Sequence, residues 1–156
     1  MLLQSPMMKL AKFLRLQSIV IGLRAADKWA AIDELLATLD AQGLVTDAAQ
    51  VREDLIAREK RMSTGMELGL AIPHAKSTGA TGLAVALGIK PKGLDFASLD
   101  GEPARVIFLV VSRKDTTGPH IQCLAEIATA YSREGTRQAL LAAGTPAEAL
   151  RVLTGS

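Results

Sequence analysis

The sequence predicts one α/β domain in which helices pack on a single sheet of mixed strand direction. Strand-like segments and segments of helical periodicity follow one another in the order strand, two helices, several strands, helices. Residues 106–111 are apolar at every position, which is typical of a central strand buried on both faces. The chain has 156 residues, 49% of them hydrophobic, enough for one core and too few for two ordinary domains.

Local signals define the first half of the chain. Residues 19–23 are short and β-branched, as in a strand. Asp27 can cap the N-terminus of a helix that keeps helical spacing and ends at Gly43. Asp47 can cap a second helix, whose basic last turn at residues 58–61 suits the negative end of the helix dipole.

Two further strands are expected before the apolar one. Residues 69–72 predict a buried strand that stops at Pro73 and presents His74 at its end. Residues 82–89 predict another strand, which the turn signal at residues 91–93 ends.

Three helices complete the chain. Gly118-Pro119 opens the first, with proline in the favoured first helical position. Residues 139–141 belong to a short helix. Thr145 has the spacing of a capping box and begins the last helix.

Composition excludes several classes of function. The net charge of +2 and the 3% aromatic content give no support to nucleic-acid binding. No apolar run approaches the roughly 18 residues of a membrane span, so no membrane insertion is expected. Cys123 is the only cysteine, which excludes an internal disulfide and fits a reducing compartment. The basic N-terminal segment does not resemble a secretory leader, and a cytoplasmic location is expected.

His74 is the first candidate for chemistry. It is one of two histidines and follows a loop bracketed by Gly65 and Gly69. Imidazole can act as a nucleophile or a general base near neutral pH. The alternative is a polar side chain that lies at a turn without a chemical role.

His120 and Arg58 are supporting candidates. His120 lies at the start of a predicted helix, where backbone N–H groups attract an anion and disfavour imidazolium. Its alternative is an exposed helix-end residue. Arg58 precedes the glycine loop, and its guanidinium could hold phosphate. Its alternative is a solvated cation at a helix end.

A metal site is a rival interpretation. His120 and Cys123 are three residues apart on one helix face, and His74 could join them. The set lacks H-E-x-x-H and paired cysteines, so no metal or cofactor is expected. Neither a Walker A motif nor G-x-S-x-G occurs, so ATP use and acyl hydrolysis have no support.

These motifs together resemble the IIA domains of the bacterial phosphoenolpyruvate-dependent sugar phosphotransferase system, in the fructose–mannitol branch that includes stand-alone nitrogen-regulatory IIA proteins. The resemblance covers about residues 9–153, and the domain is assigned to residues 9–156 after an extension at residues 1–8. The matching pieces are Arg58-Glu59, Ser63-Thr64-Gly65, Gly69-Leu70-Ala71-Ile72-Pro73-His74, Leu94-Asp95-Phe96, Asp100-Gly101, the apolar strand, and His120 before Leu124-Ala125.

The resemblance implies a mixed sheet sandwiched between α-helices and a phosphoryl relay. His74 would accept phosphate from a histidine-containing phosphocarrier protein and pass it to a IIB domain, or signal to a regulatory target. His120 would support the phosphorylated ring, Arg58 would lie near it, and Ser63, Thr64, Gly65 and Gly69 would form the substrate loop. The alternative is a protein-binding module of the same fold for which transfer is dispensable.

One position departs from the family. Glu67 stands where the family commonly has glycine. A side chain here could force a different backbone, and a carboxylate near an incoming phosphate is repulsive. The expectation is slower phosphoryl acceptance or narrower donor choice.

Overall fold

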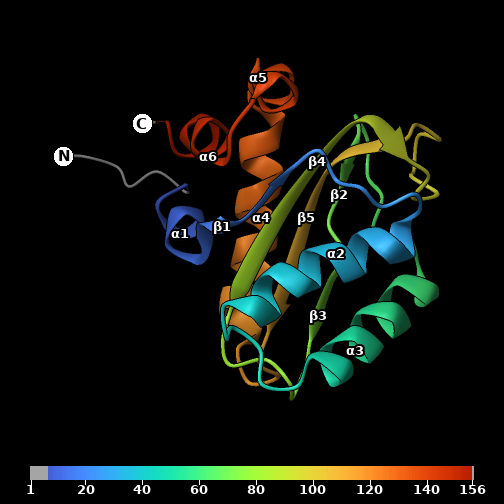
Figure 1. Cartoon of the computed structure of the whole chain (residues 1–156), viewed down its shortest axis with the longest axis vertical. Helices are drawn as coiled ribbons and strands as arrows, with labels where there is room; N and C mark the ends of the chain where they lie inside the picture. Colours follow the sequence, from blue (N-terminus) through green and yellow to red (C-terminus); the bar gives the residue numbers. More distant parts are fainter. Residues whose placement is uncertain (1–6, 156) are drawn as a thin grey trace.

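A computed structural model describes residues 7–155 and contains one five-stranded mixed sheet (Figure 1). The strand order is β1–β4–β5–β2, and β3 also pairs with β5. β4 and β5 are antiparallel, and the other pairs are parallel. The elements are α1 Met7–Phe13, β1 Leu14–Ile21, α2 Lys28–Ala41, α3 Ala48–Arg61, β2 Leu70–Ala71, β3 His74–Lys76, β4 Ala84–Leu94, β5 Ala104–Ser112, α4 Thr117–Ser132, α5 Thr136–Ala142 and α6 Pro146–Thr154.

Helices cover both faces of the sheet, as the resemblance implies. Figure 1 shows α2 and α3 in front of the strands and α4 behind them. Two apolar clusters follow this division. One joins the sheet to α1, α4, α5 and α6, and the other joins it to α2 and α3. Every residue of 106–111 is 0% exposed, so the predicted central strand is confirmed.

The predicted helix starts agree with the structure where a side chain caps the helix. Asp27 accepts from the Ala30 N–H at 2.8 Å and Asp47 accepts from the Gln50 N–H at 3.1 Å. Thr145 accepts from the Glu148 N–H at 3.1 Å before α6. These contacts span three residues, which is why the sequence is sufficient to predict them.

Three predicted boundaries are wrong. α4 begins at Thr117, so Pro119 is its third residue rather than its first. β1 covers Leu14–Ile21, earlier than residues 19–23. β4 continues past residues 91–93 to Leu94, because an irregularity in the pairing with β5 accommodates the proline. α1 was not predicted; it crosses the predicted boundary between residues 8 and 9, which stays a prediction.

The segment before His74 also differs from the prediction. β2 has two residues, and His74 itself opens β3 rather than following a strand. β2 and β3 pair with β5 in the same register on either side of Pro73. Pro73 therefore interrupts the pairing without shifting the alignment, because it lacks an N–H while its carbonyl still accepts from Val110 at 3.0 Å.

Candidate functional site

The half-buried imidazole of His74 is fixed by the chain just before it. Its Nδ1 lies 2.7 Å from the carbonyl oxygen of Ile72. A carbonyl only accepts, so Nδ1 carries the proton and the lone pair of the neutral ring is on Nε2. Burial lowers the pKa of His74, and Arg58 lowers it further, while the Ile72 carbonyl and Glu59 oppose them. The ring is therefore neutral at pH 7.

The fold brings His120 beside His74. The two ring centroids are 5.6 Å apart, with the planes tilted by 55°. His120 is 5% exposed, and its Nδ1 lies 2.7 Å from Oγ of the buried Ser112. Burial lowers its pKa to about 4, with smaller contributions from His74 and Lys76. Two neutral imidazoles thus share one site, and the alternative of His120 as an exposed helix-end residue is excluded.

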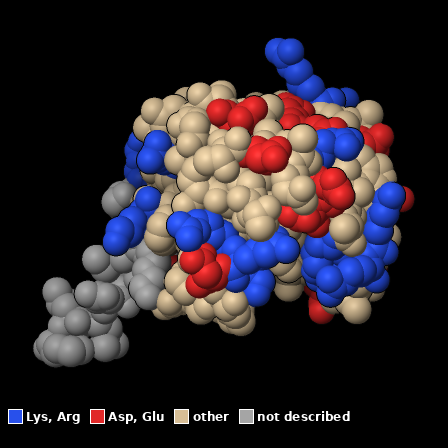
Figure 2. All heavy atoms as spheres, turned by 90° about the horizontal axis from the view of Figure 1, so that it is seen from below, with Lys and Arg blue, Asp and Glu red and all other residues tan. Residues whose placement is uncertain are grey.

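The histidines line an open pocket of about 600 Å³ whose other polar walls are mostly cationic. The pocket residues besides the histidines are Asp54, Ala57, Arg58, Arg61, Ala75, Lys76, Lys114, Ile121 and Leu124. Four cations against one carboxylate favour an anionic ligand. Charge is also uneven on the face of the molecule that Figure 2 shows. Figure 2 shows most basic side chains in the lower half of the view and most acidic ones in the upper half.

Arg58 is at the edge of this pocket. It is half-buried, and one guanidinium N–H donates to the carbonyl of Met62 at 2.8 Å. That bond satisfies a carbonyl just past the C-terminus of α3 and ties the guanidinium to the start of the loop. Arg58 also lines a second hollow of about 290 Å³, which His74 borders as well. Arg58 therefore borders both hollows at His74.

Three of the four predicted loop residues border that second hollow. Ser63, Thr64 and Gly65 line it, whereas Gly69 does not. A Cβ on Gly65 would lie 2.4 Å from Oγ of Ser98, so the close packing of two loops requires glycine there. Gly69 has φ +81°, and its carbonyl accepts from two N–H groups at the start of β5. Gly69 therefore allows the turn before β2 and anchors that turn to β5.

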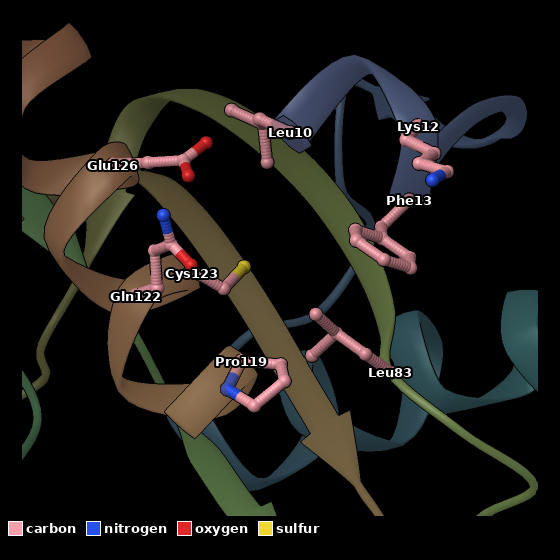
Figure 3. A pocket seen from close by; sticks show the side chains of 8 residues that line it. All are labelled: Leu10, Lys12, Phe13, Leu83, Pro119, Gln122, Cys123 and Glu126. Atoms are coloured by element: carbon pink, nitrogen blue, oxygen red, sulfur yellow. The ribbon is translucent and has the colours of Figure 1, made fainter. Parts of the chain in front are cut away.

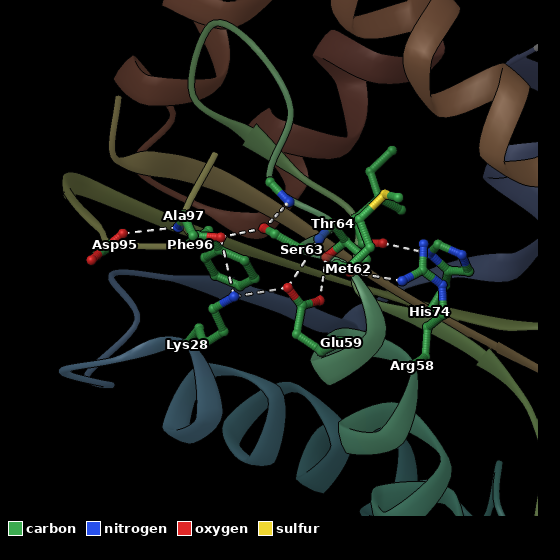
Figure 4. A network of polar contacts seen from close by, with 12 residues as sticks. Lys28, Arg58, Glu59, Met62, Ser63, Thr64, His74, Asp95, Phe96 and Ala97 are labelled. Atoms are coloured by element: carbon green, nitrogen blue, oxygen red, sulfur yellow. Dashed lines mark hydrogen bonds and ion pairs between the residues drawn. The ribbon is translucent and has the colours of Figure 1, made fainter. Parts of the chain in front are cut away.

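The polar groups of Ser63 and Thr64 are already bonded within the protein (Figure 4). The Thr64 N–H donates to Oε2 of Glu59 at 2.9 Å, and its hydroxyl donates to Oε1 at 2.5 Å. The Ser63 hydroxyl donates to the carbonyl of Phe96. Neither hydroxyl hydrogen is therefore available to cradle an anion in this conformation.

The sequence reasoning missed Glu59 and Lys28. Glu59 is 3% exposed, and Nζ of Lys28 lies 2.9 Å from its carboxylate. Nothing in the sequence marks Glu59 as buried, because it stands in a run of four charged residues at a helix end. Ser112 was missed for a similar reason, since its contact with His120 depends on packing between β5 and α4.

Comparison with known proteins shows the family. The sequence profile described as "Phosphoenolpyruvate-dependent sugar phosphotransferase system, EIIA 2" matches residues 12–156. The chain belongs to this EIIA family.

The EIIA chain resembles both sugar-specific and regulatory relatives. It is 34% identical to the PTS system fructose-specific EIIABC component of Bacillus subtilis, over 87% of this chain and 21% of that protein. It is 37% identical to the nitrogen regulatory protein of Pseudomonas aeruginosa, over 75% of this chain and 76% of that one. The chain thus spans about a fifth of the first relative and three quarters of the second.

Among solved structures, nitrogen regulatory protein IIA-Ntr from Neisseria meningitidis matches the EIIA chain with a TM-score of 0.85. The identity is 29%, over 93% of this chain and 99% of that one. The predicted sandwich fold is therefore confirmed.

Cys123 of the EIIA chain does not line the pocket that contains the two histidines. Cys123 lines a separate pocket of about 190 Å³ between α1 and α4 (Figure 3), with Leu10, Lys12, Phe13, Leu83, Pro119, Gln122 and Glu126. Burial raises the pKa of its thiol to about 12, helped by Glu126. The metal-ligand trio considered from sequence is thus not assembled. Within residues 7–155, no group of three or more His, Cys, Asp or Glu is placed to hold a metal ion.

Glu67 is exposed on the loop of the EIIA chain and lines neither hollow at His74. Positive φ falls on the next residue, Leu68, whose N–H donates to Asp100 at 3.0 Å and whose carbonyl accepts from Tyr131 at 2.6 Å. The backbone at Glu67 therefore does not require glycine.

None of the described helices is long and apolar enough to cross a bilayer.

Proposed function

We propose that this EIIA domain is a phosphoryl carrier and that Nε2 of His74 holds the phosphoryl group. The observation that carries the proposal is the 2.7 Å contact of Nδ1 with the Ile72 carbonyl, which leaves the lone pair on Nε2. A nucleophile with this tautomer needs no base to activate it. The cationic pocket around the ring supplies the charge that phosphoryl transfer requires.

The transfer step balances between two imidazoles. The donor is a phosphohistidine, protonated on its other ring nitrogen, of a small phosphocarrier protein. Nε2 of His74 attacks phosphorus, the N–P bond of the donor breaks, and the donor leaves as neutral imidazole. His74 keeps its Nδ1 proton and gains positive charge on the ring, which strengthens the bond to the Ile72 carbonyl.

His120 and Arg58 assist in this proposal. A neutral His120 ring can hydrogen-bond to phosphoryl oxygens, and its low pKa keeps it from competing as a cation with the carrier ring. Arg58, Arg61, Lys76 and Lys114 offset the phosphoryl charge. No metal or cofactor is part of the proposed step.

Partner proteins dock around the same ring in this proposal. Met62, Leu99 and Ile121 are 69%, 80% and 60% exposed, and each borders one of the two hollows at His74. Exposed apolar side chains beside a charged site support contact with proteins. The donor would be the histidine-containing phosphocarrier protein, and the acceptor a IIB domain or a regulatory target. A cytoplasmic location is proposed, in keeping with a single reduced thiol.

The second candidate is a regulatory binding module for which transfer is dispensable. The same apolar side chains favour it, because binding alone would use them. A partner bound equally by the wild type and by His74→Ala, with unchanged biological output, would favour this candidate.

The test is phosphoryl uptake from phosphoenolpyruvate through the general phosphotransferase components. The purified protein should gain one acid-labile phosphate, and ³¹P NMR should report a phosphohistidine with the Nε2 shift. His74→Ala should gain none, while His120→Ala should still gain one. Full labelling of His74→Ala would overturn the assignment.

A further inference from the structure

We infer that Glu59, with Lys28 and Thr64, positions the ring of His74. The expected effect on phosphoryl uptake rests on the proposed function, whereas the positioning of the ring does not. This positioning assigns a role to the buried ion pair of Lys28 and Glu59, which lines neither hollow at His74. It also explains why the hydroxyl of Thr64 is turned inward rather than toward the pocket.

The first step is the fixation of Thr64. Both carboxylate oxygens of Glu59 are used, Oε2 by the Thr64 N–H at 2.9 Å and Oε1 by the Thr64 hydroxyl at 2.5 Å. Two bonds from one residue to one carboxylate restrict both position and rotation. Thr64 is buried, so water does not compete for these bonds.

The second step runs from Thr64 to the carrier ring. The Ile72 N–H donates to the Thr64 carbonyl at 3.1 Å, and the Ile72 carbonyl accepts from Nδ1 of His74 at 2.7 Å. The peptide units on either side of Ile72 therefore connect Thr64 to the ring. A shift of Thr64 would move the acceptor that sets the tautomer of His74.

The third step holds Glu59 itself. Nζ of Lys28 lies 2.9 Å from Oε2 and donates to the carbonyl of Phe96 at 3.1 Å, and it lies 5.2 Å from the centre of the Phe96 ring. The Ser63 hydroxyl donates to the same carbonyl. Figure 4 shows these contacts joining the start of α2, the end of α3 and the two loops. A buried carboxylate without its cation would be strongly unfavourable, which explains the pairing.

The test compares Thr64→Val with Thr64→Ser. Valine keeps the shape and the backbone N–H but removes the hydroxyl donor, whereas serine retains it. In ¹H–¹⁵N spectra of the His74 ring, Thr64→Val should lower the share of the Nδ1–H tautomer. Phosphoryl uptake should slow by roughly 10- to 100-fold, the cost of a small misplacement. Thr64→Ser should restore both readings.

Glu59→Gln tests the carboxylate, and Lys28→Met/Glu59→Gln removes the cation with it so that folding is preserved. Both should shift the ring spectrum as Thr64→Val does. Because Glu59 raises the pKa of His74, both should also lower that pKa.

Val51→Ala is the matched control, since Val51 is buried on α3 and has no bond to this network. It should reduce stability while leaving the ring spectrum and the uptake rate as in the wild type. If the network variants lose stability but keep the wild-type ring spectrum, the positioning role is wrong. The ring spectrum needs no phosphate, so it tests the inference even if His74 proves not to be phosphorylated.

Discussion

The ring centroids of His74 and His120 lie 5.6 Å apart, although β4, β5 and the first residues of α4 separate the two histidines in the chain. Each ring has its Nδ1 within 2.7 Å of an oxygen, Ile72 O for one and Ser112 Oγ for the other. Both pKa values are lowered, mainly by burial. The relationship is therefore one of two neutral rings held by separate partners beside a cationic pocket.

His120→Ala should slow phosphoryl transfer without abolishing uptake. The variant removes a positioned group, so onward transfer should fall by roughly 10²–10⁴-fold. Rapid-quench kinetics from the phosphorylated protein to an acceptor would measure this. Ser112→Ala, which loses the partner of His120, should show a smaller loss of the same kind. Unchanged transfer in His120→Ala would mean that the ring is structural.

Stability should fall with acid in a window set by His120. Its pKa is about 4 in the folded protein and ordinarily 6.5, so the unfolded chain binds more protons between these values. The stability that the buried, neutral His120 contributes to the folded protein is fully present above pH 6.5, and it is lost as the pH falls toward 4. Denaturant unfolding of the wild type and His120→Gln from pH 7.5 to 4 would measure it. The wild type should lose more stability than the variant, and parallel curves would contradict the low pKa.

Arg58→Lys should impair uptake even though the charge is kept. The lysine ammonium has its N–H donors on one compact nitrogen, so it does not span the Met62 carbonyl and a phosphoryl oxygen as the planar fork does. Losing one charged hydrogen bond, about 1.5–3 kcal/mol, slows uptake by roughly 10- to 100-fold. Arg52→Lys is the matched control, on the same helix but paired with Asp33 outside the histidine pocket. Equal rates for both variants would make Arg58 an ordinary surface cation.

Glu67→Gln should accelerate uptake at low salt and have no effect at high salt. The carboxylate is exposed and outside both hollows, so its repulsion of an incoming phosphoryl group acts through solvent and is screened. Glu67→Gly should accelerate uptake no more than Glu67→Gln, because the backbone at this position has no positive φ. It should also lower stability through chain entropy. A further gain with glycine would show that the family's glycine acts through the backbone.

The features that depend on near neighbours in the chain could be predicted from the sequence. Asp27, Asp47 and Thr145 cap the helices predicted for them, because a cap contacts an N–H three residues on. The apolar run at 106–111 is the central strand, because a strand buried on both faces tolerates no polar side chain. The Ile-Pro-His motif and its upstream loop were sufficient to indicate the family.

The polar contacts around the His74 ring depend on tertiary packing and could not be predicted from the sequence. Glu59 stands in a charged run, which predicts exposure, yet it is buried because Lys28 reaches it from 31 residues away. Ser63 and Thr64 matched the family's loop, but the structure shows that both hydroxyls donate inward. The pairing of His74 with His120 requires β3, β5 and α4 to meet. Such contacts depend on long-range packing, and the free energy that holds them comes from the core rather than from the residues themselves.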